Sequence, residues 1–236
     1  MRIASKLHPV LRVAVLAALI ATSAQEAAMA ASDAVVAAPL PTTDLSVLAP
    51  SLKVGDAVFI RIAFRPFEEV AIVTDTWTNH VGIVVDVSGA EPLVAESAFP
   101  FSRITTLSRF VARSGRQRFA VTRLNDDLTQ VQQVEILAAA RRRLGILYDT
   151  GFDLHSRRQF CSRYVREVLQ EGAGRSIGDV ETFAHLLSHH PDAHLSFWKV
   201  WYFGRIPWSR ETVTPASILR SQQMHLMFDG TAMART

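Results

Sequence analysis

The spacing of hydrophobic residues changes along this chain, and the change predicts its secondary structure. Between residues 57 and 124, apolar residues form short runs or alternate with polar ones, as β-strands require. Between residues 129 and 172 they recur every three or four positions, as in amphipathic helices. The predicted strands are 57–62, 80–87, 93–98 and 119–124, and the predicted helices are 129–144, 161–172 and 216–219. Strands followed by helices indicate the α+β class, with an antiparallel sheet packed on helices.

The same periodicities predict which side chains face the core. The alternation in the second strand places His80, Gly82 and Val84 on one face and Val81, Ile83 and Val85 on the other. In the first helix, the apolar stripe is predicted to be Val131, Val134, Leu137 and Leu144, with Gly145 as the stop. In the second helix, Cys161, Val165 and Val168 share one stripe.

The N-terminal segment resembles a secretory signal peptide. Cations at Arg2, Lys6 and Arg12 precede a short apolar run, and Ala28-Met29-Ala30 offers small residues for cleavage. An uncleaved membrane anchor is the alternative, although the run is shorter than the roughly 20 residues that span a bilayer. We therefore expect four regions: a signal peptide at 1–30, an Ala/Pro-rich tether at 31–50, a catalytic domain at 51–228 and a disordered tail at 229–236.

The charge of the chain gives little support to binding of nucleic acid. The formal net charge is +3, and removal of residues 1–30, with three cations and Glu26, lowers it to +1. Such a near-neutral domain has no electrostatic footprint for a polyanion. We expect a periplasmic or secreted protein with no nucleic-acid partner and no stable membrane span. The oligomeric state stays open.

The only cysteine of the sequence, Cys161, begins a predicted helix. A lone thiol in an exported protein cannot form an intramolecular disulfide, so Cys161 is either a small buried hydrophobe or a nucleophile. The start of a helix lowers the pKa of a thiol and offers free backbone N–H groups to an oxyanion. Such a nucleophile needs a histidine base and a polar group that orients the histidine.

The best partners for Cys161 are His80 and Glu96. His80 lies at the start of a strand, and Glu96 is a carboxylate among apolar neighbours, where it needs a partner. Both residues have ordinary alternatives: a surface histidine at a strand end, and a solvent-facing glutamate. Asp86 lies at the far end of the His80 strand, and His155 is a weaker rival to His80.

Three groups of motifs together resemble a known family. They are Gly55-Asp56 with Val58-Phe59, then Asn79-His80-Val81-Gly82-Ile83-Val84 and Val94-Ala95-Glu96; Gly145, Tyr148-Asp149, Phe152-Asp153 and Phe160-Cys161-Ser162; and Val213-Thr214-Pro215 with Leu219 and Ser221. Over residues 52–225 the chain is similar to YiiX/YebB-like proteins, in the permuted branch of the papain-like NlpC/P60 cysteine hydrolase superfamily.

The resemblance implies a circularly permuted papain-like fold in which the histidine strand precedes the cysteine helix. It implies Cys161 as nucleophile, His80 as general base and Glu96 as the orienting group. Tyr148 and Ser162 are the candidate substrate-binding residues. Relatives commonly carry a glutamate two residues after the cysteine, where this chain has Arg163.

Two other features of the sequence permit different interpretations. Glu181, His185 and His189 are spaced four apart, with His190 and His194 nearby, but Pro191 interrupts the run and a surface segment explains it better than a metal site. Within the irregular region 176–215, the aromatic run from Trp198 to Phe203 is either a plug over the core, a lid, or a lipid-contacting surface.

These observations predict an exported thiol hydrolase that cleaves an amide or ester through an acyl-enzyme on Cys161, without metal or organic cofactor. The expected substrate is a cell-wall peptide, such as a peptidoglycan peptide, or a lipid-like small molecule. A lipid-directed amidase or acyltransferase of the same fold is the alternative enzyme. A non-catalytic cell-envelope binding module is the alternative outside enzymes.

Overall fold

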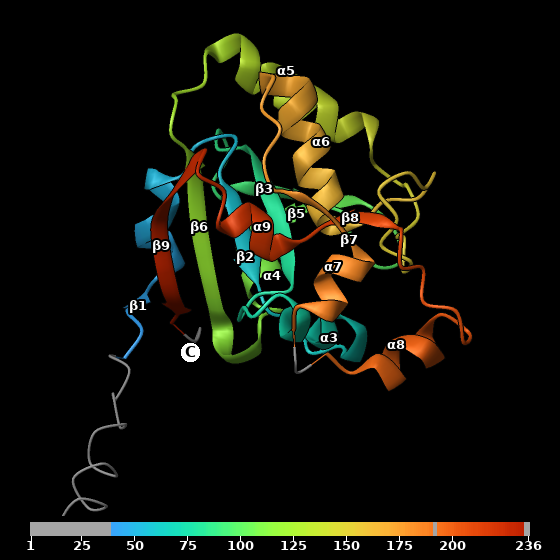
Figure 1. Cartoon of the computed structure of the whole chain (residues 1–236). Coiled ribbons are helices and arrows are strands. Elements are labelled where there is room, and N and C mark those ends of the chain that lie inside the picture. The colour runs from blue at the N-terminus through green and yellow to red at the C-terminus, as the bar shows by residue number, and fades with distance from the viewer. Residues whose placement is uncertain (1–38, 191–192, 234–236) are drawn as a thin grey trace, which may run out of the picture. The chain divides into compact units, whose positions relative to one another are not determined.

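A seven-stranded, mostly antiparallel sheet forms the centre of the protein (Figure 1). The computed structural model describes residues 39–190 and 193–233. The strand order in the sheet is β1-β9-β6-β2-β3-β4-β5, and β7 and β8 form a separate pair. The strands are β1 (Thr42–Thr43), β2 (Ala57–Ile60), β3 (His80–Asp86), β4 (Leu93–Glu96), β5 (Arg103–Thr106), β6 (Arg118–Leu124), β7 (Val180–Thr182), β8 (Glu211–Val213) and β9 (Met224–Ala232).

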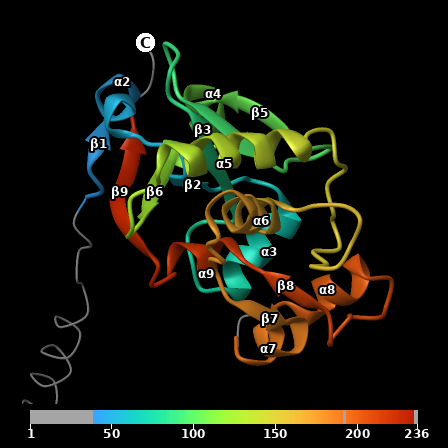
Figure 2. The same cartoon turned by 90° about the horizontal axis from the view of Figure 1, so that it is seen from above.

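Helices cover both faces of this sheet (Figure 2). The helices are α2 (Leu45–Leu48), α3 (Arg65–Val73), α4 (Leu107–Val111), α5 (Gln130–Arg142), α6 (Cys161–Ala173), α7 (Phe183–Ser188), α8 (Leu195–Trp201) and α9 (Pro215–Leu219), with 3-10 turns η1 (Ala49–Ser51) and η2 (Gly115–Gln117). Helices α3, α5 and α6 pack with the larger apolar core, whereas α4 and α2 lie over the smaller one. The fold is α+β, as the sequence predicts.

The predicted alternation of β3 is confirmed. Val81, Ile83 and Val85 belong to the core beneath α5 and α6, and Val84 belongs to the opposite core. Because a strand alternates its side chains, His80 at its first position leaves the strand on the Val84 side, at the edge where both cores meet. Its ring lies between Phe67 and Phe110, one from each core.

The predicted apolar stripe of α5 is wrong for Val131, Val134 and Leu144, which are exposed, and Leu144 lies beyond the end of the helix at Arg142. The buried residues are Ile136, Ala139 and Ala140. The reason is the close approach of α5 to α6: a Cβ built on Gly172 of α6 would lie 2.6 Å from the backbone nitrogen of Ile136. Small residues permit this distance, so the contact face of α5 follows its alanines rather than its valines.

Both ends of the expected catalytic domain extend further than predicted. Thr42 and Thr43 pair with Thr231 and Ala232 of β9 in parallel, and Leu45 and Leu48 pack on the smaller core. The expected tether at 31–50 is therefore wrong from Thr42 onward, and the expected tail at 229–236 is wrong for Asp229–Ala232. Backbone pairing to β6 holds this last segment in the sheet. The predicted signal peptide, residues 31–38 and residues 234–236 lie outside the described residues.

The residues from Leu40 onward form one unit by their contacts. Within the described residues, no helix is both long and apolar enough to span a bilayer.

Replacement of Gly172 by alanine tests the α5–α6 contact. Alanine normally stabilises a helix interior relative to glycine, but here the added methyl group meets the Ile136 backbone. We expect Gly172→Ala to lower the free energy of unfolding by about 2 kcal/mol, measured by urea denaturation. Gly89→Ala, whose nearest atom would be 3.9 Å away, is the matched control and should change stability little. An unchanged Gly172→Ala midpoint would contradict the close contact.

Candidate active site

The sulfur of Cys161 lies at the positive end of the central helix. Cys161 is the first residue of α6, and Phe160, the residue before it, is extended and caps the helix with no side-chain hydrogen bond. The N–H groups of the first turn therefore stay available to a ligand, and the helix dipole favours a thiolate there. The side chain is 4% exposed, but it lines a pocket.

His80 faces this cysteine from the neighbouring strand β3. Its Nε2 makes a 2.6 Å hydrogen bond to Oε2 of Glu96, and both side chains are buried. Its Nδ1 has no hydrogen-bond partner of well-formed geometry among the described residues. Stacking on Phe67, with ring centroids 6.1 Å apart, helps to fix the plane of the imidazole. The ring thus offers one nitrogen to the sulfur while Glu96 holds the other.

Three cationic groups surround Glu96. Besides His80, the Arg113 guanidinium donates to both carboxylate oxygens at 2.7 Å, and Arg103 Nε donates to Oε1 at 3.1 Å. Burial alone would raise the pKa of Glu96, but His80 and Arg113 outweigh it and lower the pKa to about 2. The carboxylate is therefore ionised at every pH at which the protein would work.

The sulfur and the imidazole stabilise each other as an ion pair. Burial disfavours the charged form of His80, yet the charge and hydrogen bond of Cys161, followed by those of Glu96, raise its pKa to about 9. Burial likewise raises the pKa of Cys161, but the His80 imidazolium outweighs it and the net pKa falls below its ordinary value. The backbone N–H of Val81 and the hydroxyl of Tyr148 add hydrogen bonds to the thiolate.

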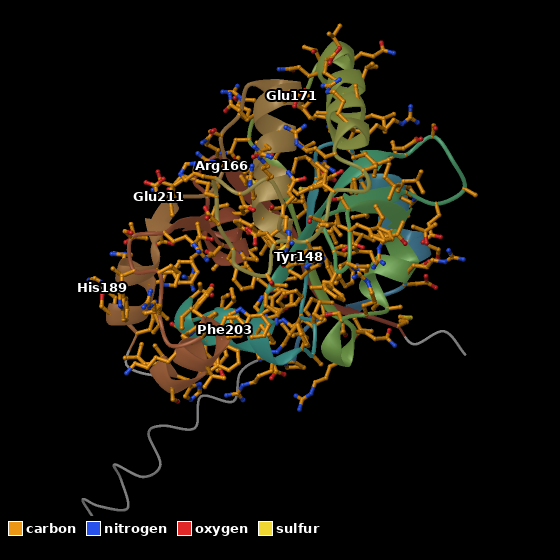
Figure 3. The ribbon with its side chains drawn as sticks, turned by 90° about the vertical axis from the view of Figure 1, so that its right-hand side faces the viewer. Tyr148, Arg166, Glu171, His189, Phe203 and Glu211 are labelled. Atoms are coloured by element: carbon orange, nitrogen blue, oxygen red, sulfur yellow. The ribbon has the colours of Figure 1, made fainter. Side chains whose placement is uncertain are left out.

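Tyr148 supplies a second donor beside the nucleophile. Its hydroxyl donates to Sγ of Cys161 at 4.0 Å. Burial, then the adjacent thiolate, raises its pKa well above the ordinary value, so the phenol stays protonated. Figure 3 shows Tyr148 near the middle of the unit. The phenol and the Cys161 backbone N–H together form a cradle for the oxyanion of an attacked carbonyl.

The pocket at the sulfur is apolar. It is narrow, with about 30 Å³ open to the centre of a water-sized sphere, and its walls come from α3, α7, α8, β8 and the segment before α6. Its main apolar lining residues are Val70, Val73, Phe160, Leu186, Leu187 and Trp198. None of the described residues that line it is an acid, a lysine, an arginine or a histidine. The cysteine of the charged Cys161–His80 pair therefore borders a narrow apolar pocket.

Ser162 also lines the pocket, but its hydroxyl donates to the carbonyl of Val213 at 2.7 Å. This bond ties α6 to β8, and a role for Ser162 in substrate binding stays a prediction. His155 is exposed and pairs with Glu211 instead of reaching the cysteine.

The histidine-rich segment forms separate pairs. His194 pairs with Glu69, and Glu181 lies 3.4 Å from His185. In the part of the chain that the structure describes, no three Cys, His, Asp or Glu side chains are grouped as metal ligands. Pro191 lies outside that part.

Arg163 stands where similar proteins commonly have a glutamate. It holds the loop that precedes Cys161. Its guanidinium pairs with Glu167 at 2.7 Å and donates to the carbonyls of Ser156 and Arg158 at 2.6 and 3.0 Å. The arginine therefore fixes the loop that leads into α6 without touching the catalytic pair.

Sequence reasoning missed Arg103 and Arg113. Both arginines sit in short elements, β5 and the turn after α4, that carry no hydrophobic period of their own. The one available signal was the buried carboxylate at Glu96, which required a cation whose position in the chain was unspecified.

Comparisons with known proteins show the family and the fold of this chain. The family described as permuted papain-like amidase enzyme, YaeF/YiiX, C92 family matches residues 51–228. The uncharacterized protein YiiX of Escherichia coli (strain K12) is 26% identical over 170 residues, which are 72% of this chain and 83% of that protein. The crystal structure of the metalloprotein yiiX from Escherichia coli O157:H7 superposes with a TM-score of 0.70 at 24% identity, over 76% of this chain and 98% of the other. This last likeness shows the fold alone.

Substitution of Glu96 by glutamine tests the ion pair. The amide removes a charge that raises the pKa of His80, so the imidazolium, and with it the thiolate, becomes less populated. We expect the Cys161 alkylation rate with iodoacetamide at pH 6 to fall about tenfold. Glu135→Gln, an exposed carboxylate on α5, is the control and should react like wild type. Equal rates for Glu96→Gln and wild type would refute the pairing.

The ionised Glu96 also makes the stability of the protein depend on pH, and Glu96→Gln tests this. The pKa of Glu96 is about 2 when folded and near 4.5 when unfolded, so its carboxylate stabilises the fold above pH 4.5 and loses that contribution as the pH falls through 2. We expect the difference in unfolding free energy between wild type and Glu96→Gln to be largest at pH 6 and to shrink as the pH falls from 4.5 to 2. Guanidinium denaturation at a series of pH values measures it. A constant difference would show that Glu96 is not held as a carboxylate by its neighbours.

Proposed function

The chain belongs to the permuted papain-like amidase family, and we propose that it is an exported cysteine amidase whose substrate carries an apolar acyl group. Membership of this family, together with the Cys161–His80 pair, makes it a thiol-dependent hydrolase. The apolar pocket beside Cys161 is the observation that supports an acyl chain.

The first half-reaction forms a thioester. The Cys161 thiolate attacks the amide carbonyl carbon, a C–S bond forms, and the oxygen becomes an oxyanion within reach of the Cys161 N–H and the Tyr148 hydroxyl. His80, held as imidazolium by Glu96, gives its proton to the amide nitrogen. The C–N bond then breaks, the amine leaves, and the acyl group stays on sulfur.

The second half-reaction regenerates the enzyme. His80, now neutral, takes a proton from water, and the hydroxide attacks the thioester carbonyl. The C–S bond breaks, the carboxylic acid leaves, and the thiolate–imidazolium pair is restored. Glu96 stays ionised throughout and keeps Nε2 of His80 bound, so that Nδ1 remains on the side of the sulfur.

The pocket favours an acyl chain over a cell-wall peptide. Stem peptides of the cell wall carry carboxylates and amines, whereas the described lining of the pocket offers neither acid nor base side chains to bind them. An apolar chain would gain free energy from each methylene that leaves water, about 0.8 kcal/mol. Transfer of the acyl group to an alcohol or amine instead of water is the related activity, and a labelled acceptor would trap it.

Export is supported by the sequence. The cations before the short apolar run and the small residues at Ala28-Met29-Ala30 are typical of a cleaved signal. We therefore place the enzyme in the periplasm or outside the cell.

A series of N-acyl anilides with chains of increasing length tests the substrate class. We expect kcat/KM to rise about fourfold per methylene until the pocket is full, and Cys161→Ala to abolish turnover. Leu186→Trp fills the pocket and should shift the optimum to shorter chains, whereas Leu226→Trp, at an exposed position of β9, should not. A flat dependence on length, or faster turnover of peptide amides than of acyl anilides, would refute the proposal. Binding without any turnover would identify a non-catalytic module.

A further inference from the structure

Helix α8 has one face in the pocket and the other in solvent. Trp198 lines the acyl pocket and is buried, whereas Val200 and Phe203 are 79% and 96% exposed. Successive residues of a helix turn by about 100°, so Val200 points away from Trp198 and Lys199 points to the side. The aromatic run is thus a plug over the core on one side and an exposed apolar surface on the other.

Phe203 adopts a backbone conformation that costs free energy. Its φ is +51°, in the left-handed region. Its N–H bonds the Val200 carbonyl at 3.1 Å, and the Gly204 N–H bonds the Lys199 carbonyl at 2.6 Å, which together form a Schellman motif at the end of α8. Glycine or asparagine normally occupies the position of Phe203 because a bulky side chain is strained there. Folding alone therefore does not explain a phenylalanine at this position.

Cations surround these exposed apolar side chains. Lys199 and Arg205 are exposed, and neither makes an ion pair with any residue that the structure describes. Arg65 lies 5.7 Å from the Phe197 ring but pairs with Glu69, so Lys199 and Arg205 are the cations available to a ligand. Apolar side chains surrounded by lysine and arginine have the composition that binds an anionic lipid surface.

The same helix contacts the loop that follows Tyr148. Trp201 Nε1 donates to the Thr150 carbonyl at 3.0 Å, and the Tyr202 hydroxyl donates to the Gly151 carbonyl at 3.1 Å. A ligand that immobilises α8 from outside would therefore also hold this loop beside the nucleophile.

The geometry points to a membrane-docking surface made of Lys199, Val200, Phe203 and Arg205, whose partner is an anionic phospholipid bilayer. Val200 and Phe203 enter the interface, and Lys199 and Arg205 contact the phosphates. This inference rests on the proposed function and extends it. A surface that docks on the bilayer next to the acyl pocket would let a substrate with an apolar chain enter from the bilayer. The binding itself needs no catalysis.

Vesicle co-sedimentation of the Cys161→Ala variant separates binding from turnover. We expect binding to vesicles of phosphatidylglycerol and phosphatidylethanolamine, loss of binding with rising salt, and weak binding to phosphatidylcholine. Binding in this assay without hydrolysis of acyl anilides by the wild type would refute the proposed function and leave the docking surface standing. Hydrolysis of acyl anilides by the wild type without vesicle binding would refute the docking surface and leave the proposed function standing.

Phe203→Asn tests the role of the strained residue. We expect about tenfold weaker vesicle binding, together with a rise of a few degrees in the midpoint of thermal unfolding, because asparagine tolerates the left-handed conformation. Val131→Ser, at an exposed valine of α5, is the control for loss of an apolar side chain and should bind vesicles as before. Unchanged binding by Phe203→Asn overturns the inference. A dimer that Phe203→Asn dissociates, in a protein that ignores vesicles, also overturns it and identifies a second copy as the partner.

Discussion

The hydrogen bond between His80 and Glu96 is the contact on which the site depends. It turns the imidazole so that Nδ1 is left for the sulfur, and it supplies part of the negative field that keeps the ring protonated. A buried carboxylate would not stay ionised alone, and Arg103 and Arg113 make it stable. The chemistry at Cys161 therefore rests on four side chains from separate elements, and the order of the sheet is what brings them together.

The sequence indicated Cys161, His80 and Glu96 as one group because each of these residues breaks a local pattern. A histidine at a strand start, a carboxylate between apolar neighbours and a lone cysteine at a helix start are each costly without partners, and the structure brings the three together. The central strands were predictable for a related reason: residues buried on two sides leave continuous apolar runs, as in β2 and β3. A strand that is buried on both faces can therefore be recognised from a single sequence.

The parts that sequence could not supply depend on distant contacts. In α5 the valines gave the stronger hydrophobic signal, but the backbone of Ile136 against Gly172 decided which face is buried. Strand β9 was missed because it mixes exposed Leu226 and Met227 with Gly230, and its identity comes from pairing with β6. The positions of Arg103 and Arg113 around Glu96 could not be predicted either, because only the folded chain brings them next to the carboxylate.

The pairing of β9 has a consequence for how the chain acquires its structure. This last strand lies between β6 and β1, so the sheet stays open at that edge until residues near 230 are available. The histidine, the carboxylate and finally the cysteine all precede it in the chain. During synthesis, β1 therefore has no neighbour in the sheet until β9 has been made. The hydrogen bonds that join the first strand to the rest of the sheet thus form late, after the segments that carry the histidine, the carboxylate and the cysteine.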